Sequence, residues 1–236
     1  MSLVLLAPIG LDAGSWQWTD LPTAGTIKHE FPGFGRRPRA SEQPDIAMLA
    51  DEVAESYPGE LDVVGVSLGG MVGQHLAVRH PERVRSLVVA CTGAAADPEV
   101  MAKRAAEVEE GGMAAVLEST LERWFTPEAL ALRPEHPGVD YARRALLALD
   151  PGSFADGWRV IGGHDVRERL PEIRARVTCV AGSADTASPA ARTKDVADRI
   201  HGSRFLVLDG PHIMHLERPA EFSAVVREHL RWVEGG

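Results

Sequence analysis

The chain has 236 residues, of which 44% are hydrophobic and 25% charged, and its formal net charge is −9. This length is enough for one sizeable core with a small appended subdomain. The acidic balance argues against a nucleic-acid partner, because phosphate contacts need a basic face, and no Lys/Arg-rich run marks an anionic membrane surface.

The amino-terminal stretch "MSLVLLAPIG" lacks the charged region and long apolar core of a signal peptide, and it reads as a first strand. No apolar run approaches the length of a membrane span. The two cysteines, Cys91 and Cys179, lie inside apolar strand-like runs, so both are expected to be buried thiols. We therefore expect a cytoplasmic protein without a disulfide framework and without a membrane partner.

Short apolar runs recur along the chain, and helical patterns lie between them. The expected strands are 3–8, 26–32, 61–67, 84–92, 177–183 and 204–210. The expected helices between and after them are 43–57, 68–80, 189–201 and 219–233. Near-continuous apolar strands are typical of parallel sheets that are buried on both faces. The alternation therefore predicts an α/β fold, with a mostly parallel six-stranded sheet and right-handed crossovers.

One interval breaks this alternation. Between the fourth and fifth expected strands no strand pattern occurs, and helices are expected over 98–110, 112–125, 138–149 and 151–161. Glycines and prolines separate these helices. An insertion at this place is predicted to cover the carboxyl ends of the strands, where open α/β sheets bind ligands. The predicted organisation is a core formed by 1–96 and 163–236 with a helical lid formed by 97–162.

The sequence Gly65-Val66-Ser67-Leu68-Gly69 is a G-x-S-x-G pattern between an expected strand and an expected helix. A strand that turns directly into a helix strains the middle residue and excludes bulky side chains two positions away. The turn lifts the serine hydroxyl out of the sheet at the positive end of the helix. Ser67 is therefore the candidate nucleophile, and the N–H of Leu68 is a candidate donor to an oxyanion.

A serine nucleophile needs a neighbouring base and a third group that orients the base. With this turn, the acid and then the histidine are expected further along the chain. Asp185 follows the fifth expected strand, and His212 follows the sixth. Asp97 is a rival for the acid and His215 a rival for the base. The His212-x-x-His215 spacing lacks a third ligand, so no metal is predicted.

The second oxyanion donor is expected in the loop after the first strand. The N–H of Ile9 fits this role, because Pro8 has no N–H to offer.

Several segments resemble proteins of the α/β-hydrolase fold family, and in particular the 3-oxoadipate enol-lactonases. The resembling segments are "APIGLDAGSW", "EFPGFGRR", "GVSLGGMVGQHLAVRHPERVRSLVV", "GGMAAVLESTLERWFTPEAL", "LLALDPGSFADGW", "DVRERLPEIRARVTCVAG" and "PHIMHLERPAEF". The resemblance implies Ser67 as nucleophile, Asp185 as acid and His212 as base, with no cofactor. It also implies hydrolysis of a small enol-lactone that bears a carboxylate side chain.

The chain departs from that pattern in three places. Ala7-Pro8 stands where many family members have His-Gly, and Pro211 stands where a glycine is usual. The usual amino-terminal antiparallel hairpin is missing, so the strand at 26–31 is expected at a sheet edge. An open edge favours a homodimer unless charges such as Lys28 and Glu30 oppose the pairing.

Substrate specificity is expected to come from the lid. Trp124, Phe125 and Trp158 are the aromatic residues expected to face substrate. A carboxylate-bearing substrate needs a cation, for which Arg123, Arg143 and Arg144 are candidates.

Three classes of function fit these features. The first is a serine hydrolase of a small lactone or ester, including a carboxylesterase or methylesterase. The second is a lyase on the same scaffold, similar to the hydroxynitrile lyases. The third is a small-molecule receptor that retains the triad.

Overall fold

Six parallel strands form the centre of the molecule in a computed structural model that describes residues 2–235. The strands are β1 (Ser2–Leu6), β2 (Thr26–His29), β3 (Leu61–Val66), β4 (Val84–Ala90), β5 (Arg176–Gly182) and β6 (Arg204–Leu208). Their order is β2-β1-β3-β4-β5-β6, and each neighbouring pair is parallel. The predicted sheet is confirmed, and β2 lies at one edge with the exposed Lys28 on it.

Two hydrophobic cores cover the two faces of the sheet, because successive side chains of a strand point to opposite faces. In β1, Val4 and Leu6 belong to one core, while Leu3 and Leu5 belong to the other. The strands β1, β3, β4 and β5 are buried on both sides almost throughout, as the near-continuous hydrophobic runs predicted. The prediction was wrong for β2 and β6, which lie at the sheet edges and are only partly buried, with Leu206 and Val207 of β6 exposed.

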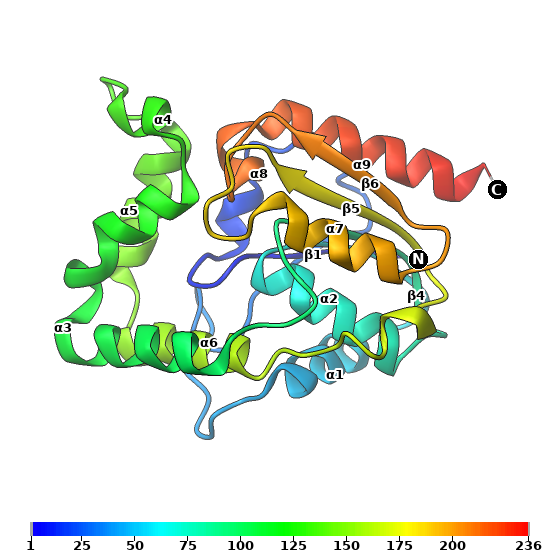
Figure 1. The fold of residues 1–236 in the computed structure, drawn as a ribbon, viewed down its shortest axis with the longest axis horizontal. Helices are drawn as coiled ribbons and strands as arrows, with labels where there is room; N and C mark the ends of the chain where they lie inside the picture. Colours follow the sequence, from blue (N-terminus) through cyan, green and yellow to red (C-terminus); the bar gives the residue numbers. More distant parts are fainter. Residues whose placement is uncertain (1, 236) are drawn as a thin grey trace.

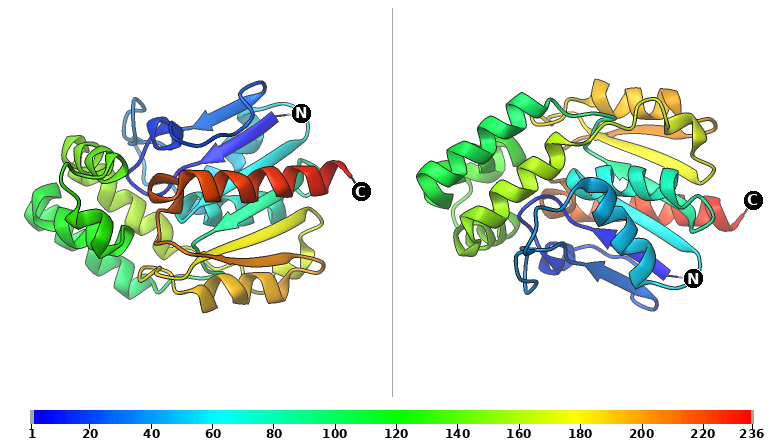
Figure 2. Two further views of the ribbon diagram at one scale, coloured as in Figure 1. Left: turned by 90° about the horizontal axis from the view of Figure 1, so that it is seen from above. Right: turned by 90° about the horizontal axis from the view of Figure 1, so that it is seen from below.

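Four helices pack on these faces. They are α1 (Ile46–Ser56), α2 (Leu68–Arg79), α7 (Ala190–Arg199) and α9 (Pro219–Glu234). Residues of α1, α2 and α7 join the core that contains Val4, whereas Phe222 and Val226 of α9 join the core that contains Leu5. Figure 2 shows α9 in front of the sheet from one side and α1 with α2 on the opposite side.

The helices between β4 and β5 form a separate cluster, which we call the helical insertion. Its members are α3 (Pro98–Trp124), α4 (Pro127–Ala131), α5 (Pro137–Ala148) and α6 (Pro151–Gly162). Each begins with a proline directly after a residue whose side chain accepts from a backbone N–H of the first turn. Figure 1 shows the insertion at the end of the sheet toward which the β5 and β6 arrows point, away from both termini.

Helix α3 is broken at Gly112, where φ is 68° and ψ is −178°. This backbone conformation is open essentially to glycine alone. The break divides α3 into two arms, which is consistent with the separate helices expected at 98–110 and 112–125. The shorter elements were not predicted from sequence: α4, α8 (Met214–Glu217), and the 3-10 helices η1 (Ala13–Trp16) and η2 (Leu170–Glu172).

Both cysteines are free thiols and are buried, as expected. Among the helices of residues 2–235, none combines the length and the apolar character that crossing a bilayer requires.

Candidate active site

Ser67 stands at the corner between β3 and α2. Its φ is 53° and its ψ is −116°, a backbone conformation that residues other than glycine rarely adopt. The corner is tight, because a Cβ on Gly65 would overlap the carbonyl of Gly69, and a Cβ on Gly69 would overlap that of Leu6. The two glycines of the G-x-S-x-G pattern therefore allow the backbone to pass close enough to hold Ser67 in this position.

Asp185 and His212 form a buried hydrogen-bonded pair. The Nδ1–H of His212 donates to Oδ2 of Asp185 over 2.9 Å, and both side chains are almost fully buried. The other oxygen, Oδ1, accepts from the N–H groups of Ala187 at 2.9 Å and Ser188 at 2.7 Å. These three bonds fix the carboxylate, which in turn fixes the imidazole with Nε2 turned away from the acid.

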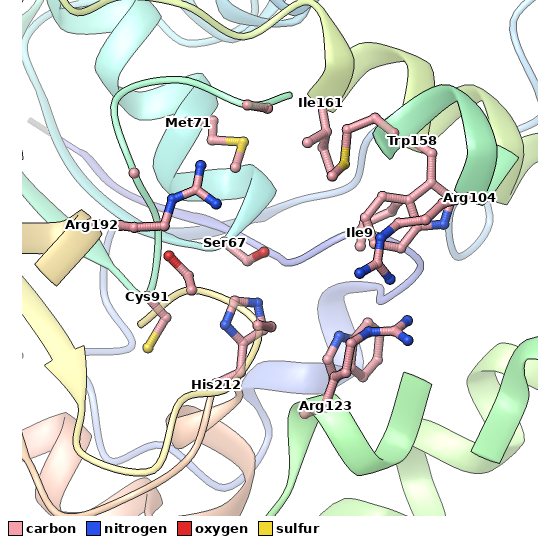
Figure 3. Close-up of a pocket in the computed structure, with 16 residues that line it drawn as sticks. Ile9, Ser67, Met71, Cys91, Arg104, Arg123, Trp158, Ile161, Arg192 and His212 are labelled. Atoms are coloured by element: carbon pink, nitrogen blue, oxygen red, sulfur yellow. The ribbon is translucent and has the colours of Figure 1, made fainter. Parts of the chain in front are cut away.

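Ser67 and His212 line the same cavity, which has a volume of about 70 Å³. Figure 3 shows the serine hydroxyl and the imidazole ring facing this pocket. The structure therefore brings together the three residues singled out in the sequence, which come from the ends of β3, β5 and β6.

Two backbone N–H groups are available beside the hydroxyl. Leu68 is the first residue of α2, so its N–H lies at the positive end of the helix dipole. Ile9 follows β1 and lines the cavity. Within residues 2–235, neither N–H donates to another group. Both can therefore bind an oxyanion without losing a hydrogen bond.

Cys91 lies behind the acid–base pair. Cys91 lines the cavity, and its sulfur, the Asp185 carboxylate and the His212 ring lie within 4.8 Å of one another. Burial, followed by the charge of Asp185, raises the pKa of this thiol well above its usual value. The thiol is thus neutral at physiological pH and is neither a ready nucleophile nor a ready metal ligand.

The two rival residues have structural roles. Asp97 caps α3, where its Oδ1 accepts from the N–H groups of Glu99 at 3.0 Å and Val100 at 3.2 Å. His215 is fully buried and packs 4.6 Å from the Trp16 ring, centroid to centroid. Burial lowers the pKa of His215 to about 3, so its ring stays neutral.

The insertion supplies the roof of the cavity. Trp124 at the end of α3 and Trp158 in α6 line it, as expected. Phe125 is buried but does not line the cavity. Its neighbour Trp124 therefore provides the aromatic surface at this point of the chain.

Only one of the three expected arginines, Arg123, lines the cavity. Arg143 forms ion pairs with Glu118 and Glu135, and Arg144 pairs with Asp140, so neither contributes to the cavity. Three other arginines line it, namely Arg104, Arg123 and Arg192. Of these, Arg123 was among the sequence candidates, whereas Arg104 and Arg192 have no local pattern that separates them from surface arginines.

Hydrogen bonds tie the roof to the loop that carries His212. The N–H of Ile213 donates to the carbonyl of Trp124 over 3.1 Å. Glu217 in α8 accepts from the Thr126 N–H at 2.9 Å and from its hydroxyl at 2.7 Å. The residue after His212 is thus bonded directly to a residue that lines the cavity.

Comparison with known proteins places this geometry among hydrolases. The model of the alpha/beta hydrolase family matches residues 3–225. The chain is 31% identical over 168 residues to 3-oxoadipate enol-lactonase 2 of Acinetobacter baylyi, a match that covers 71% of this chain and 62% of that relative. It is 30% identical to a pimeloyl-[acyl-carrier protein] methyl ester esterase of Aeromonas hydrophila, over 97% of this chain and 94% of the relative.

A solved structure supports the same likeness. The enol-lactonase from Burkholderia xenovorans LB400 superposes with a TM-score of 0.91 at 26% sequence identity. The superposition covers 97% of this chain and 90% of that one.

Proposed function

The chain belongs to the alpha/beta hydrolase family, and from that membership we propose that it hydrolyses a small lactone or carboxylic ester through an acyl-enzyme at Ser67. The observation that carries the proposal is the buried Asp185–His212 pair, which shares one small cavity with a serine at a strained corner. A serine hydroxyl is a weak nucleophile, and a base held in this way activates it.

In the proposed first step, Nε2 of His212 removes the proton of Ser67 as the oxygen bonds to the substrate carbonyl carbon. The carbonyl oxygen becomes an oxyanion, which accepts hydrogen bonds from Leu68 and Ile9. Each such donor stabilises the transition state by about 3 kcal/mol. The ester C–O bond then breaks and the leaving oxygen takes the proton from His212.

In the second step, His212 removes a proton from water, whose oxygen attacks the acyl carbon. The bond to Ser67 breaks and the serine recovers its proton, so an acid is released and the enzyme is unchanged. Asp185 holds the imidazole in the required tautomer and stabilises the imidazolium in both steps.

The specific substrate that we propose resembles 3-oxoadipate enol-lactone. The likeness to two enol-lactonases supports this choice. The lactone ring carries its own leaving group, an enolate that is stable enough to need little help from a general acid. The helical insertion, corresponding to the predicted lid over 97–162, would select the substrate through Trp124 and Trp158.

A methyl ester is the second candidate substrate. The methyl ester esterase of Aeromonas hydrophila matches nearly the whole chain. The same serine chemistry serves both substrates, so only the rates can separate them. The assay should therefore compare kcat/KM for 3-oxoadipate enol-lactone with kcat/KM for methyl esters of short acids.

Replacing the nucleophile tests the chemistry itself. Wild-type protein mixed with p-nitrophenyl acetate should release a burst of p-nitrophenol equal to the number of active sites. Ser67→Ala should abolish the burst and lower kcat by roughly a thousandfold or more, since the nucleophile is gone. Ser183→Ala is the matched control, because Ser183 is an exposed serine in the loop that follows β5.

A burst of equal size in Ser67→Ala would contradict the proposal. Absence of hydrolysis in the wild type, together with tight binding of an ester, would instead favour a receptor that retains the three residues.

A further inference from the structure

Two arginines on α3 face the cavity from its roof. Arg104 lies on the first arm and Arg123 on the second, and the break at Gly112 brings the arms together. Figure 3 shows both guanidinium groups on the insertion side of the pocket, opposite Arg192. Two positive groups from distant turns thus line the same cavity as the candidate nucleophile.

Neither guanidinium has an acidic partner within ion-pair distance in residues 2–235. Arg104 lies over the Trp158 ring, 5.0 Å from its centroid, and its Nε is buried without a hydrogen-bond partner. Arg123 donates to the Thr120 hydroxyl over 3.2 Å. In contrast, three other arginines of the insertion form ion pairs: Arg143, Arg144 and Arg159.

The pair is electrostatically unfavourable as it stands. Burial, with the neighbouring charge of Arg104 as the next cause, lowers the pKa of Arg123 to about 10. Burial also lowers the pKa of Arg104. Glu107 acts in the opposite sense on both groups, but it is exposed and forms no ion pair with either. Two half-buried cations without a counter-ion therefore have unused capacity to bind an anion.

We propose that Arg104 and Arg123 together bind a free carboxylate of the substrate, so that the enzyme selects esters and lactones of dicarboxylic acids over neutral ones. This inference rests on the proposed hydrolysis at Ser67. A carboxylate fits the two planar guanidinium groups, because its two oxygens can each accept from one of them. The cation–π contact with Trp158 holds the Arg104 group at the cavity.

The same arrangement has a consequence for the product. Cleavage of a monoester or lactone of a dicarboxylic acid frees a second carboxylate at the Ser67 end. The product dianion then has one end at the arginine pair and the other at the oxyanion donors. A saturated dicarboxylate such as adipate should therefore compete with substrate.

The experiment compares two esters that differ in charge at the far end of the acyl chain. The mono-p-nitrophenyl ester of adipic acid ends in a carboxylate, and p-nitrophenyl hexanoate has the same chain length but ends in a methyl group. In the wild type, kcat/KM should be about tenfold to a hundredfold higher for the charged ester, the range expected for hydrogen bonds to a charged group. Adipate should inhibit hexanoate cleavage competitively.

Substitution of the pair provides the second arm. Arg104→Gln and Arg123→Gln should each raise KM for the charged ester by about tenfold or more and weaken adipate inhibition. Both should leave hexanoate cleavage within about threefold of the wild type, which also shows that the variants are folded and that Ser67 remains active. Arg144→Gln is the matched control, an exposed arginine of the insertion outside the cavity.

Three results would overturn the inference. The first is a wild type that shows no preference for the charged ester and no inhibition by adipate. The second is loss of the same size on both esters in the variants. The third is an effect of Arg144→Gln equal to that of the pair. If neither ester is cleaved, the proposed function itself fails and the inference fails with it.

Discussion

At Ser67 the backbone is held in a conformation that favours glycine, although the side chain there cannot be glycine if it is to react. A strained non-glycine residue costs roughly 1–3 kcal/mol. The neighbouring strand and helix enforce the corner, because the close packing of Gly65 and Gly69 leaves the chain no other path. The conformation that would expose the Ser67 hydroxyl for reaction therefore lowers the stability of the fold.

A comparison of two variants can measure this cost. Ser67→Ala keeps the Cβ atom and the strain, whereas Ser67→Gly removes both. We expect the unfolding free energy of Ser67→Gly to be about 1 kcal/mol higher than that of Ser67→Ala. The free energy gained by relief of strain should exceed the entropic cost of ordering glycine on folding. Urea denaturation of the two inactive variants gives the difference. Equal stabilities would mean that the corner stores no strain.

The sequence was informative about residues with a strict local requirement. Ser67 stands in a spaced pattern, and Asp185 and His212 follow predicted strands, so the order along the chain was sufficient to select them. Arg104 carries no such signal, because its proposed role depends on the fold of α3 against α6. Arg143 and Arg144 resembled it in sequence, yet nearby acids engage them at the surface.

At the scale of the element, the break in α3 sets the shape of the roof. A continuous helix of this length would carry Arg104 and Arg123 far apart, since each residue adds about 1.5 Å along the axis. Gly112 turns the second arm back, and both arms then reach the cavity.

Substitution of Gly112 should lower the stability of the protein because of its backbone conformation and not because of a steric clash. A Cβ at Gly112 would meet no atom within 4 Å, but the φ of 68° is unsuitable for alanine. We expect Gly112→Ala to lower the unfolding free energy by about 1–3 kcal/mol and to raise KM for the charged ester.

Gly163→Ala is the control for this prediction, because Gly163 caps α6 with a φ of −84° and a Cβ there would make ordinary contacts. We expect that variant to change the unfolding free energy by less than about 0.5 kcal/mol. Thermal melts of both proteins would show the contrast. A Gly112→Ala protein as stable as the control would contradict the assignment of the break to this residue.

Long elements were predictable because their hydrophobic pattern repeats. All six strands and the helices on the sheet were expected within a few residues of their observed bounds. The helices α4 and α8 are only 5 and 4 residues long, too short for periodicity to show. Their positions depend on tertiary bonds such as those between Thr126 and Glu217.

Across the whole molecule, buried histidines make stability depend on pH. Burial lowers the pKa of these rings to about 3 for His215 and to about 4 for the others, namely His29, His75, His164 and His229. The unfolded chain has histidines with a pKa near 6.5. Below that pH the histidines of the unfolded state therefore bind protons, whereas the same rings in the folded state stay neutral.

This linkage predicts loss of stability in mild acid. The contribution of the neutral rings is fully present above about pH 6.5 and is lost as the pH falls toward 4, at up to about 1.4 kcal/mol per pH unit for each histidine. Urea unfolding at pH 7, 6 and 5 should show a progressive fall of several kcal/mol. Because unfolded carboxyl groups titrate mainly below this window, a flat profile would show that the rings accept protons in the folded state.

The bonds between the roof and the histidine loop have a mechanical consequence. If the second arm of α3 swings outward to admit a substrate, it pulls through the Trp124 carbonyl on Ile213, next to the imidazole. Opening the cavity by this hinge would thus disturb the alignment of His212, the proposed base. A substrate that entered past the exposed side chain of Arg192, whose guanidinium donates to the Ala95 carbonyl, would leave the bond between Trp124 and Ile213 in place.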